Sequence, residues 1–316
     1  MSTPKIAAIT GGIGGAKLSL GLYRVLPPDS LTLIVNTGDD FEHLGLMICP
    51  DLDTTLYTLA GLANPELGWG RRDESWNFMQ TLESLGGQTW FRLGDRDLAL
   101  HVERTRRLRA GESLSAVMAS VAGRFGIRAT LLPMSDDPVR TRVTSSAGEL
   151  AFQDYFVRLR CAPTVQALSF DGAAAAAVAP GALAALAAKD LGAIILCPSN
   201  PYLSVDPILA VPGMRAALRA GGAPVIAVTP IVGGRAVKGP TAKIMGELAL
   251  APSPLTIARH YAGLIDGFVL DRHDAALAHE FALPVHVTDT VMVELSDRER
   301  LAREVLGFAA RLGRRA

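Results

Sequence analysis

The sequence has few cysteines, few aromatic residues and no excess of charge of either sign. Its three cysteines, Cys49, Cys161 and Cys197, are far apart and form no CxxC pair. This excludes a zinc ribbon and a disulfide framework, and it predicts small buried side chains in a reducing compartment. Lysine and arginine together number 31, as do aspartate and glutamate. A basic surface for nucleic acid is therefore absent, and local groups must hold any anionic ligand.

Long apolar runs are also absent. The most lipid-like stretch, 173–188, is rich in alanine, is interrupted by Pro180 and Gly181, and is shorter than the ~20 residues of a spanning helix. We expect a core helix there. The N-terminus leads through a short strand-like run into glycines, without the apolar region or the cleavage site of a signal peptide. We therefore expect a cytoplasmic protein with no membrane partner.

What the sequence does contain is hydrophobic residues, which make up 49% of its 316 positions and can form a large core. Short apolar runs alternate with helical segments, which predicts a sheet of mostly parallel strands. The expected strands are 6–9, 31–35, 193–196, 225–228, 268–270 and 285–287. The expected helices are 16–25, 53–62, 74–85, 98–109 and 114–125. Two runs that alternate around Gly148, 141–145 and 152–158, are expected to be antiparallel strands.

These elements predict an α/β fold with a Rossmann-like, doubly wound, mostly parallel sheet and a smaller inserted α+β subdomain. We expect residues 1–316 to form a single domain. Its core is expected from roughly 1–60 and 160–316, and the insert from roughly 61–159. Because no long Pro/Ser linker is present, we expect the insert to pack on the sheet.

A glycine-rich loop, TGGIGGAK at 10–17, leads from the first expected strand into a helix. Gly12, Gly14 and Gly15 would let backbone N–H groups approach a phosphate at the positive end of that helix, and Lys17 would add a charge. The loop does not fit the Walker A pattern, because alanine precedes the lysine and leucine follows it. It does not fit GxGxxG either, because the lysine stands where the third glycine should be. The alternative is a tight turn with no ligand.

Two aspartate-rich loops follow. In NTGDDFEHLGL, the adjacent Asp39 and Asp40 could hold Mg²⁺ through oxygen ligands or bind a hydroxyl, or they could belong to an exposed turn. In CPDLDTT, Asp51 and Asp53 stand just before a helix, where either could be catalytic or could cap the helix. Both loops therefore predict carboxylates near the glycine-rich loop, with a structural alternative for each.

The segment WFRLGDRDLA combines an aromatic platform with Arg92, which could contact a phosphate or stack on a ring. It also carries Asp95 and Asp97, either of which could instead cap a helix.

Two further loops follow strands in the C-terminal half. CPSNPYLSVDPIL is too rich in Pro, Ser and Asn for helix or sheet, and it would present Ser199, Asn200 and backbone amides to a nucleotide. PIVGGRAVKGPTAK combines paired glycines with cations suited to a diphosphate, unless it is a solvated surface loop. The diphosphate-binding residues expected in this loop are Gly233, Gly234, Lys238 and Lys243.

The six loops follow or closely trail strands, and open α/β sheets bind ligands at the carboxyl ends of their strands, where the strand order reverses. One shared site is therefore the prediction. His43 lies in an aspartate loop, but the other histidines are scattered, and no GxSxG elbow is present. A serine hydrolase and a nicotinamide-dependent dehydrogenase are both disfavoured.

In this order the six loops resemble the 2-phospho-L-lactate transferase family, which makes the phosphodiester of coenzyme F420, over nearly the whole chain. The resemblance implies a Mg²⁺-dependent reaction. A guanosine diphosphate-linked phospho-acid gives its phospho-acid unit to the ribityl hydroxyl of the deazaflavin Fo, and GMP is released. It also implies a homodimer with a Rossmann-like core. The acid could be phospholactate, phosphoenolpyruvate or phosphoglycerate, which differ only by small groups.

The family's deazaflavin-binding pair matches Asp53 and Arg92 of this sequence. Our hypothesis assigns catalysis to Asp53 and Asp40: Asp39 and Asp40 hold Mg²⁺ on the diphosphate, and Asp53 orients or deprotonates the hydroxyl. Lys238 and Lys243, with the glycine amides beside them, would offset the charge of the diphosphate. The alternative is a nucleotide-sugar-binding regulator related to the gluconeogenesis-factor family, but WFRLGDRDLA and Asp53 favour the transferase.

Overall fold

The computed structural model describes residues 4–66, 68–237 and 239–315. Its centre is a seven-stranded sheet with the order β14-β13-β10-β9-β1-β2-β5, in which every neighbouring pair is parallel. These strands are β1 Lys5–Thr10, β2 Leu31–Val35, β5 Thr130–Pro133, β9 Leu191–Leu196, β10 Val225–Val228, β13 Gly267–Asp271 and β14 Val285–Thr288. The order reverses between β1 and β9, so the predicted α/β, doubly wound fold is confirmed.

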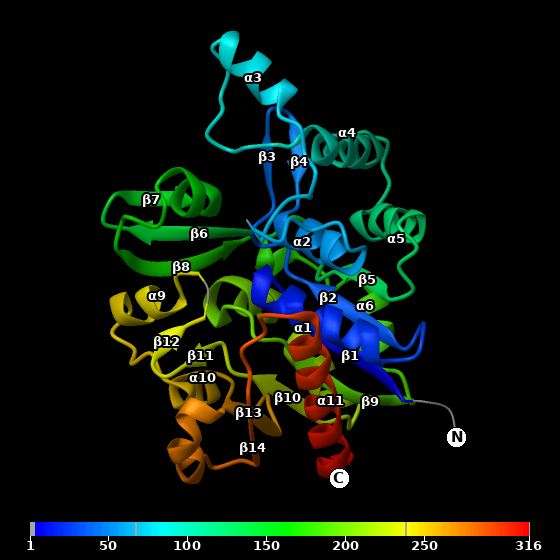
Figure 1. Cartoon of the computed structure of the whole chain (residues 1–316), viewed down its shortest axis with the longest axis vertical. Helices are drawn as coiled ribbons and strands as arrows, with labels where there is room; N and C mark the ends of the chain where they lie inside the picture. The colour runs from blue at the N-terminus through cyan, green and yellow to red at the C-terminus, as the bar shows by residue number, and fades with distance from the viewer. Residues whose placement is uncertain (1–3, 67, 238, 316) are drawn as a thin grey trace.

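Helices cover both faces of this sheet (Figure 1). In β1, Ala7 and Ile9 belong to the core on one face, and Ile6 and Ala8 belong to the core on the other. Burial on both faces explains why these strands are continuous apolar runs in the sequence. The helices on the Ile6 face are α1 Gly12–Val25, α2 Pro50–Leu59, α5 Leu114–Arg124 and α11 Leu295–Leu312. Those on the Ala7 face are α6 Pro180–Leu186, α7 Asp206–Ala210, α8 Met214–Ala220, α9 Thr241–Glu247 and α10 Pro254–His260.

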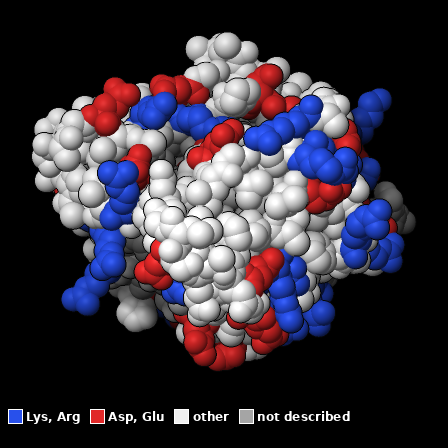
Figure 2. All heavy atoms as spheres, turned by 90° about the horizontal axis from the view of Figure 1, so that it is seen from above, with Lys and Arg blue, Asp and Glu red and all other residues white. Residues whose placement is uncertain are grey.

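A protruding lobe lies at the top of Figure 1. It contains the hairpin of β3 Phe41–His43 and β4 Leu46–Ile48, and the helices α3 Asn77–Ser84 and α4 Asp95–Arg109. A small core of its own, centred on Ile48, Met79 and Leu93, holds it together. From above, acidic and basic side chains are interspersed around a largely uncharged central area (Figure 2), as expected for a chain of zero formal net charge.

A three-stranded antiparallel sheet, β7-β6-β8, forms a second lobe. Its strands are β6 Arg140–Ser145, β7 Gly148–Ala151 and β8 Val165–Asp171. The predicted strand at 152–158 is wrong, because the chain leaves β7 there and forms η1, the π-helix Asp154–Arg158. Phe152 and Tyr155 are both buried, at a helical spacing of three that strict alternation does not give.

The expected boundaries differ from the structure in two places. The range 61–159 contains β5, which pairs with β2 in the main sheet, and it excludes β8, which belongs to the second lobe. The helix expected at 173–188 is divided into a short 3-10 helix, Ala173–Ala175, and α6. Pro180 occupies the first turn of α6, where its missing N–H has no consequence. The remaining elements are η3 Pro201–Val205, β11 Ile231–Val232, β12 Arg235–Ala236 and η4 Arg272–Glu280.

Candidate active site

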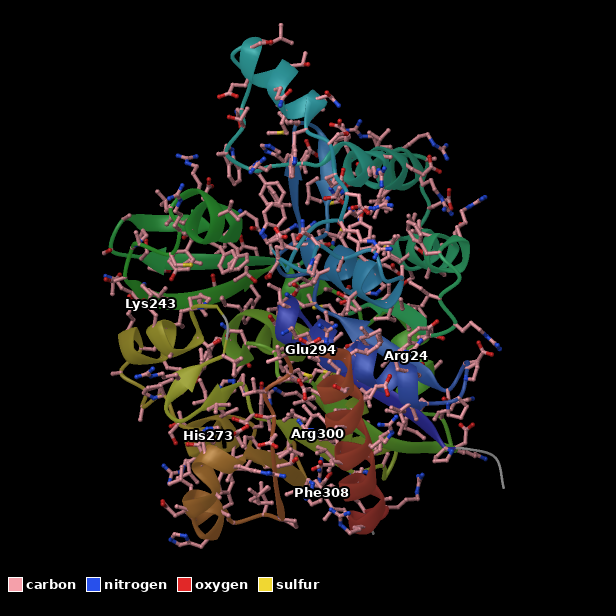
Figure 3. All side chains as sticks on the ribbon, in the orientation of Figure 1. Arg24, Lys243, His273, Glu294, Arg300 and Phe308 are labelled. Atoms are coloured by element: carbon pink, nitrogen blue, oxygen red, sulfur yellow. The ribbon has the colours of Figure 1, made fainter. Side chains whose placement is uncertain are left out.

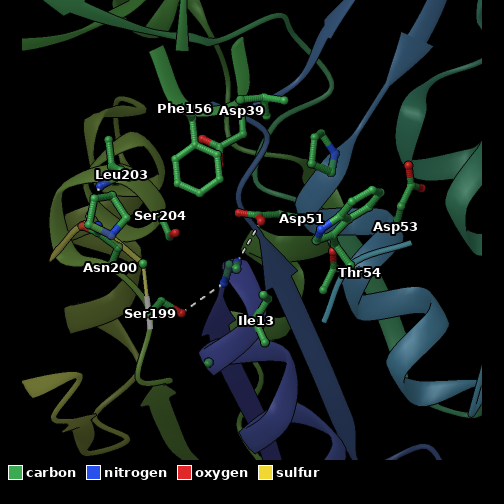
Figure 4. Close-up of a pocket in the computed structure, with 18 of the residues that line it drawn as sticks. Ile13, Asp39, Asp51, Asp53, Thr54, Phe156, Ser199, Asn200, Leu203 and Ser204 are labelled. Carbon is green, nitrogen blue, oxygen red and sulfur yellow. Dashed lines mark hydrogen bonds between the residues drawn. The ribbon is translucent and has the colours of Figure 1, made fainter. Parts of the chain in front are cut away.

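A cavity of about 480 Å³ opens at the carboxyl ends of β1 and β9, where the strand order reverses. Ligands of doubly wound sheets bind at this place. The start of α2, the aromatic segment at 90–92 and the η1 segment also line it. The residues labelled across the cavity in Figure 4 include Asn200, Ser199, Ile13, Asp51, Thr54 and Asp53.

Glycines let the loops after β1 and β9 come into contact. A Cβ atom on Gly14 would lie 2.5 Å from the backbone oxygen of Pro198, and one on Gly15 would lie 2.5 Å from Ser199 Oγ. Neither position can accept a larger side chain without movement of the other loop. Gly14 lines the cavity, whereas Gly15 packs against Ser199 outside the cavity lining.

Gly12 and Lys17 of the same loop also line the cavity. The Gly12 N–H donates a hydrogen bond to Asp51 Oδ1 at 2.8 Å (Figure 4), and Lys17 Nζ donates to the carbonyl oxygen of Met292 at 2.6 Å. The loop therefore brings the N-terminal end of α1 to the cavity, as expected for an anion site. In this structure the Gly12 N–H and the Lys17 ammonium group both donate hydrogen bonds to other residues of the protein.

Asp39 and Asp51 are buried carboxylates in the cavity wall. Asp51 does not cap α2; it accepts hydrogen bonds from Gly12 and from Asn36 Nδ2, the latter at 2.9 Å. Burial raises the pKa of Asp51 to about 6. Burial and the neighbouring Asp51 raise the pKa of Asp39 well above its usual value. Asp39 Oδ1 has no hydrogen-bond partner among the described residues, so it is available to a ligand.

Asp40 is also buried, but it does not line the cavity. Burial raises its pKa to about 7, although the positive charge of Arg140 opposes this shift. The two adjacent aspartates that the sequence predicts as metal ligands are therefore separated, with Asp39 at the cavity and Asp40 behind its wall.

Asp53 lines the cavity and is held by Arg104 of α4. Arg104 Nη1 lies 2.6 Å from Asp53 Oδ1, and Nη2 lies 2.8 Å from Oδ2. Burial opposes the charge of Arg104, but the adjacent Asp53 raises the pKa of the guanidinium. Both oxygens of Asp53 thus accept charge-assisted hydrogen bonds, and the carboxylate is fixed in orientation.

A second hydrogen-bonded group continues from Arg104 along the wall. Arg104 Nη2 lies 2.8 Å from His101 Nδ1, and a guanidinium can only donate, so this nitrogen accepts and the imidazole proton lies on Nε2. Nε2 lies 3.3 Å from Asp97 Oδ2, in contact but not aligned for a hydrogen bond. Tyr57 donates its hydroxyl proton to Asp97 Oδ1 at 2.5 Å.

Asp53, Asp97 and His101 could hold a metal by proximity, since one ligand atom from each lies within 4.8 Å of the others. However, both oxygens of Asp53 and Nδ1 of His101 already accept hydrogen bonds from Arg104. The buried guanidinium therefore supplies the positive charge that this group of residues needs.

Arg92 lies in the cavity wall with Trp90 and Phe91, and its guanidinium lies over the ring of Trp76 at 4.1 Å from the centroid. The structure thus brings Arg92 and Asp53 into one cavity. Asp95 lies outside the cavity lining and accepts hydrogen bonds from the first N–H groups of α3.

Ser199 and Asn200 line the cavity from the loop after β9. Asn200 Oδ1 accepts hydrogen bonds from the N–H groups of Tyr202 and Leu203, which fixes the orientation of its amide. Asn200 Nδ2 is buried and has no partner among the described residues. It is therefore a donor available to a ligand.

Gly233, Gly234 and Lys243, which were predicted to bind the diphosphate, do not line the cavity. Gly233 and Gly234 form the turn of the β11–β12 hairpin with φ of 55° and 73°, and the Gly233 N–H donates to Asp274. Lys243 lies on α9 (Figure 3), where it pairs with Glu247 and donates to the oxygen of Pro163. Lys238 lies outside the described residues. The described residues of this loop that line the cavity are Pro230, Val237, Gly239, Pro240 and Thr241.

The sequence profile of the family described as 2-phospho-L-lactate transferase CofD matches residues 6–306. The chain belongs to this family. It is therefore an enzyme that transfers a phospho-carboxylate unit in coenzyme F420 biosynthesis, as its six loops predict.

Relatives of this CofD family member carry a more specific name. A phosphoenolpyruvate transferase of Streptomyces griseus is 41% identical over 314 residues, which cover 96% of this chain and 98% of the relative. One of Streptomyces coelicolor shows the same identity and coverage. One of a Mycobacterium species is 38% identical over 313 residues, with 90% of this chain and 94% of the relative covered.

A solved structure of a UPF0052 family protein from Bacillus halodurans is similar in fold, with a TM-score of 0.63 over 97% of this chain and 99% of that one. Its sequence is 14% identical, so the likeness shows the fold alone. Across the described part of the CofD chain, every helix is too short or too polar to cross a membrane.

Several residues of the cavity were missed in the sequence. Arg104, which lies behind the cavity wall, and Tyr57 contact Asp53 and Asp97 across 51 and 40 positions of the chain, which no local pattern reveals. His101 contacts Asp97 and Arg104 within one helical turn of α4. Phe156 lines the cavity from η1, where a strand was predicted, and Arg160 lines it from the turn that follows η1. The helical spacing of the apolar residues between 152 and 157 was the signal that could have revealed them.

Proposed function

We propose that this enzyme transfers the phosphoenolpyruvate unit of a guanosine diphosphate-linked donor to the ribityl hydroxyl of the deazaflavin Fo and releases GMP. One observation carries the proposal: Asp53 and Arg92, which match the family's deazaflavin-binding pair, line the same cavity as the glycine-rich loop. The names of the relatives from Streptomyces and Mycobacterium support phosphoenolpyruvate as the acid.

The proposed donor occupies the side formed by the strand ends. The N-terminal end of α1 attracts the diphosphate, and Asn200 Nδ2 offers a donor that no described residue uses. The proposed acceptor occupies the opposite side, where Trp90 and Phe91 give apolar surface for a planar ring system.

The charges of the cavity wall fit a bound Mg²⁺. Among the described residues, the cavity is lined by the carboxylates of Asp39, Asp51, Asp53 and Asp97 and by the long cationic side chains of Lys17, Arg92 and Arg160. A cation bound with the diphosphate would offset the negative charge that these carboxylates and the diphosphate bring together. Asp39, with its unpartnered Oδ1, and the adjacent Asp51 have the oxygen ligands that Mg²⁺ prefers, whereas Asp40 supports the wall from behind. When bound, Mg²⁺ would neutralise charge on the diphosphate oxygens.

Asp53 is better suited to orient the acceptor hydroxyl than to remove its proton. Arg104 donates to both carboxylate oxygens, which fixes their orientation and leaves neither oxygen without a partner. Because phosphoryl transfer depends mostly on alignment and electrostatic stabilisation, a fixed carboxylate of this kind contributes by placing the hydroxyl in line with the diphosphate.

The test is GMP release and Fo binding by Asp53→Asn and Arg92→Ala, with Arg106→Ala, an exposed arginine of α4, as the control. We expect losses of turnover or Fo affinity beyond roughly a hundredfold in the first two variants and none in the third. Wild-type turnover and Fo affinity in both site variants would show that the acceptor site is misplaced. Magnesium dependence is tested by removing the ion with EDTA and restoring it.

The homodimer that the family resemblance implies stays a prediction. Light scattering of the purified protein would measure its mass against the 33.4 kDa of one chain.

A further inference from the structure

The η1 segment presents one helical face to the cavity. Phe152, Gln153, Phe156 and Val157 line the cavity at helical spacing, and Arg160 lines it from the turn that follows the helix. Gln153 Nε2 donates to the backbone oxygen of Asp39 at 2.9 Å, so this face is attached to the aspartate loop. Figure 4 shows the ring of Phe156 beside the Asp39 carboxylate.

The chain leaves this helix through an unusual turn. Arg160 and the next residue, Cys161, both have left-handed backbone conformations, with φ of 50° and 56°. Residues with a Cβ atom rarely adopt this conformation, and two in succession are rarer still. The Cys161 N–H donates to the oxygen of Tyr155 at 2.8 Å, which holds the turn in place. Retained backbone strain of this kind is concentrated at ligand sites.

The strained turn places a guanidinium at the cavity without a partner. Within residues 4–66, 68–237 and 239–315, Arg160 forms neither a hydrogen bond nor an ion pair. Arg158, two residues earlier, pairs with Asp154 at 3.1 Å and does not line the cavity. The other long cations of the wall have contacts of their own, since Lys17 donates to Met292 and Arg92 stacks on Trp76.

The chemistry of this face fits a small carboxylic acid. Phe152, Phe156 and Val157 offer apolar surface, Gln153 is engaged with Asp39, and Arg160 supplies a planar charged group that matches a carboxylate in two hydrogen bonds. Under the proposed function, the strand ends bind the nucleotide and the aromatic segment binds the deazaflavin. The η1 face is left for the acid that is transferred.

We propose that Arg160 binds the carboxylate of the transferred phospho-acid, with the apolar residues of the η1 face against its carbon skeleton. This inference rests on the proposed function. In this proposal Arg160 selects a donor that carries a carboxylate, whereas other residues bind the nucleotide.

The test compares the affinities of Arg160→Gly for GDP and for the guanosine diphosphate-linked phosphoenolpyruvate donor by calorimetry. Glycine suits the left-handed backbone at this position, so thermal stability should not fall. We expect donor binding to weaken roughly ten- to a hundredfold, with GDP and Fo binding unchanged. Arg160→Lys should recover part of the loss, and the control Arg158→Ala should bind all three ligands as the wild type does.

Three outcomes would overturn the inference. Equal losses for GDP and donor would place Arg160 on the diphosphate. A loss of affinity for Fo alone would place Arg160 at the acceptor. Unchanged affinity for the donor would show that Arg160 does not bind the donor.

A donor whose carboxylate is replaced by a carboxamide gives an independent check, because it cannot form an ion pair with Arg160. It should bind weakly to the wild type, and Arg160→Gly should bind it with the same low affinity. If the wild type neither binds the donor nor releases GMP, the proposed function itself fails. If the wild type does both and Arg160→Gly equals it, the assignment of Arg160 alone fails.

Discussion

The carboxylate of Asp53 and the guanidinium of Arg104 form a bidentate pair that joins the first turn of α2 to the middle of α4, with N–O distances of 2.6 and 2.8 Å. Arg104 has no exposed surface. Its Nε also donates to the backbone oxygen of Met47 at 3.2 Å, which adds β4 to the same contact. One buried side chain thus fixes a cavity carboxylate and connects the protruding lobe to the main body.

Replacement of Arg104 by methionine should destabilise the protein by roughly 3–5 kcal/mol, because Asp53 would be left buried without its partner. The exposed pair of Arg106 and Glu103 on the same helix gives the control, since Arg106→Ala should cost less than about 1 kcal/mol. Urea unfolding followed by circular dichroism measures both. Adding Asp53→Asn to Arg104→Met should recover part of the loss, and equal stability of Arg104→Met and the wild type would contradict the role of the pair.

The imidazole of His101 should be neutral with its proton on Nε2, because Arg104 donates to Nδ1. Nitrogen-15 NMR of labelled histidines should show this tautomer. His273 provides a contrast in the same spectrum. It is exposed, and its hydrogen bond to Asp271 raises its pKa, so it should titrate above the usual histidine range. A proton on Nδ1 of His101 would refute the hydrogen bond from Arg104.

Asp40 should make the metal-free protein less stable as the pH rises. Its pKa is about 7 in the folded state, raised by burial, and near 3.8 when unfolded, so between these values the folded state binds the extra proton. Stability is then highest below about pH 4 for this group, falls as the pH rises from about 4 to 7, and levels off above the folded pKa, with a total loss of up to about 4 kcal/mol.

Asp40→Asn should therefore be more stable than the wild type at pH 8 and similar to it near pH 4. Thermal unfolding in EDTA across this range measures the difference. Asp39 and Asp51 titrate with the same sign, so a reduced slope is expected rather than a flat one. An unchanged slope would show that Asp40 is ionised in the folded protein.

Much of the fold could be predicted because buried parallel strands and amphipathic helices leave regular apolar patterns. All six expected strands of the main sheet are present. The seventh, β5, was missed because its sequence, TLLP, ends in proline, which is unfavourable within a sheet. The glycine-rich loop was placed correctly at the reversal of strand order, since that position follows from the βαβ pattern alone.

The candidate site was less predictable because its contacts link distant parts of the chain. Asp53 and Arg104 are 51 positions apart, and nothing near either residue indicates the other. Lys243 illustrates the opposite case. A lysine among glycines suggested a ligand for a diphosphate, but Glu247 follows it by one helical turn, and the two form an ion pair. That spacing was visible in the sequence and favoured a structural role.

The glycine at position 14 should be required for the shape of the nucleotide side of the cavity. In Gly14→Ala the new methyl group would lie 2.5 Å from the oxygen of Pro198, and because both atoms belong to backbone segments, the loops after β1 and β9 must separate. We expect GDP affinity to fall at least tenfold, about 1.4 kcal/mol. Gly246→Ala is the matched control.

Gly246 lies in α9 with open space around its Cβ position and without a left-handed φ, so alanine there should raise stability by about 0.5–1 kcal/mol and leave GDP binding unchanged. Calorimetry with GDP and thermal unfolding of both variants separate an effect on the cavity from an effect on the fold. Wild-type GDP affinity in Gly14→Ala would mean that contact between these two loops does not shape the nucleotide site.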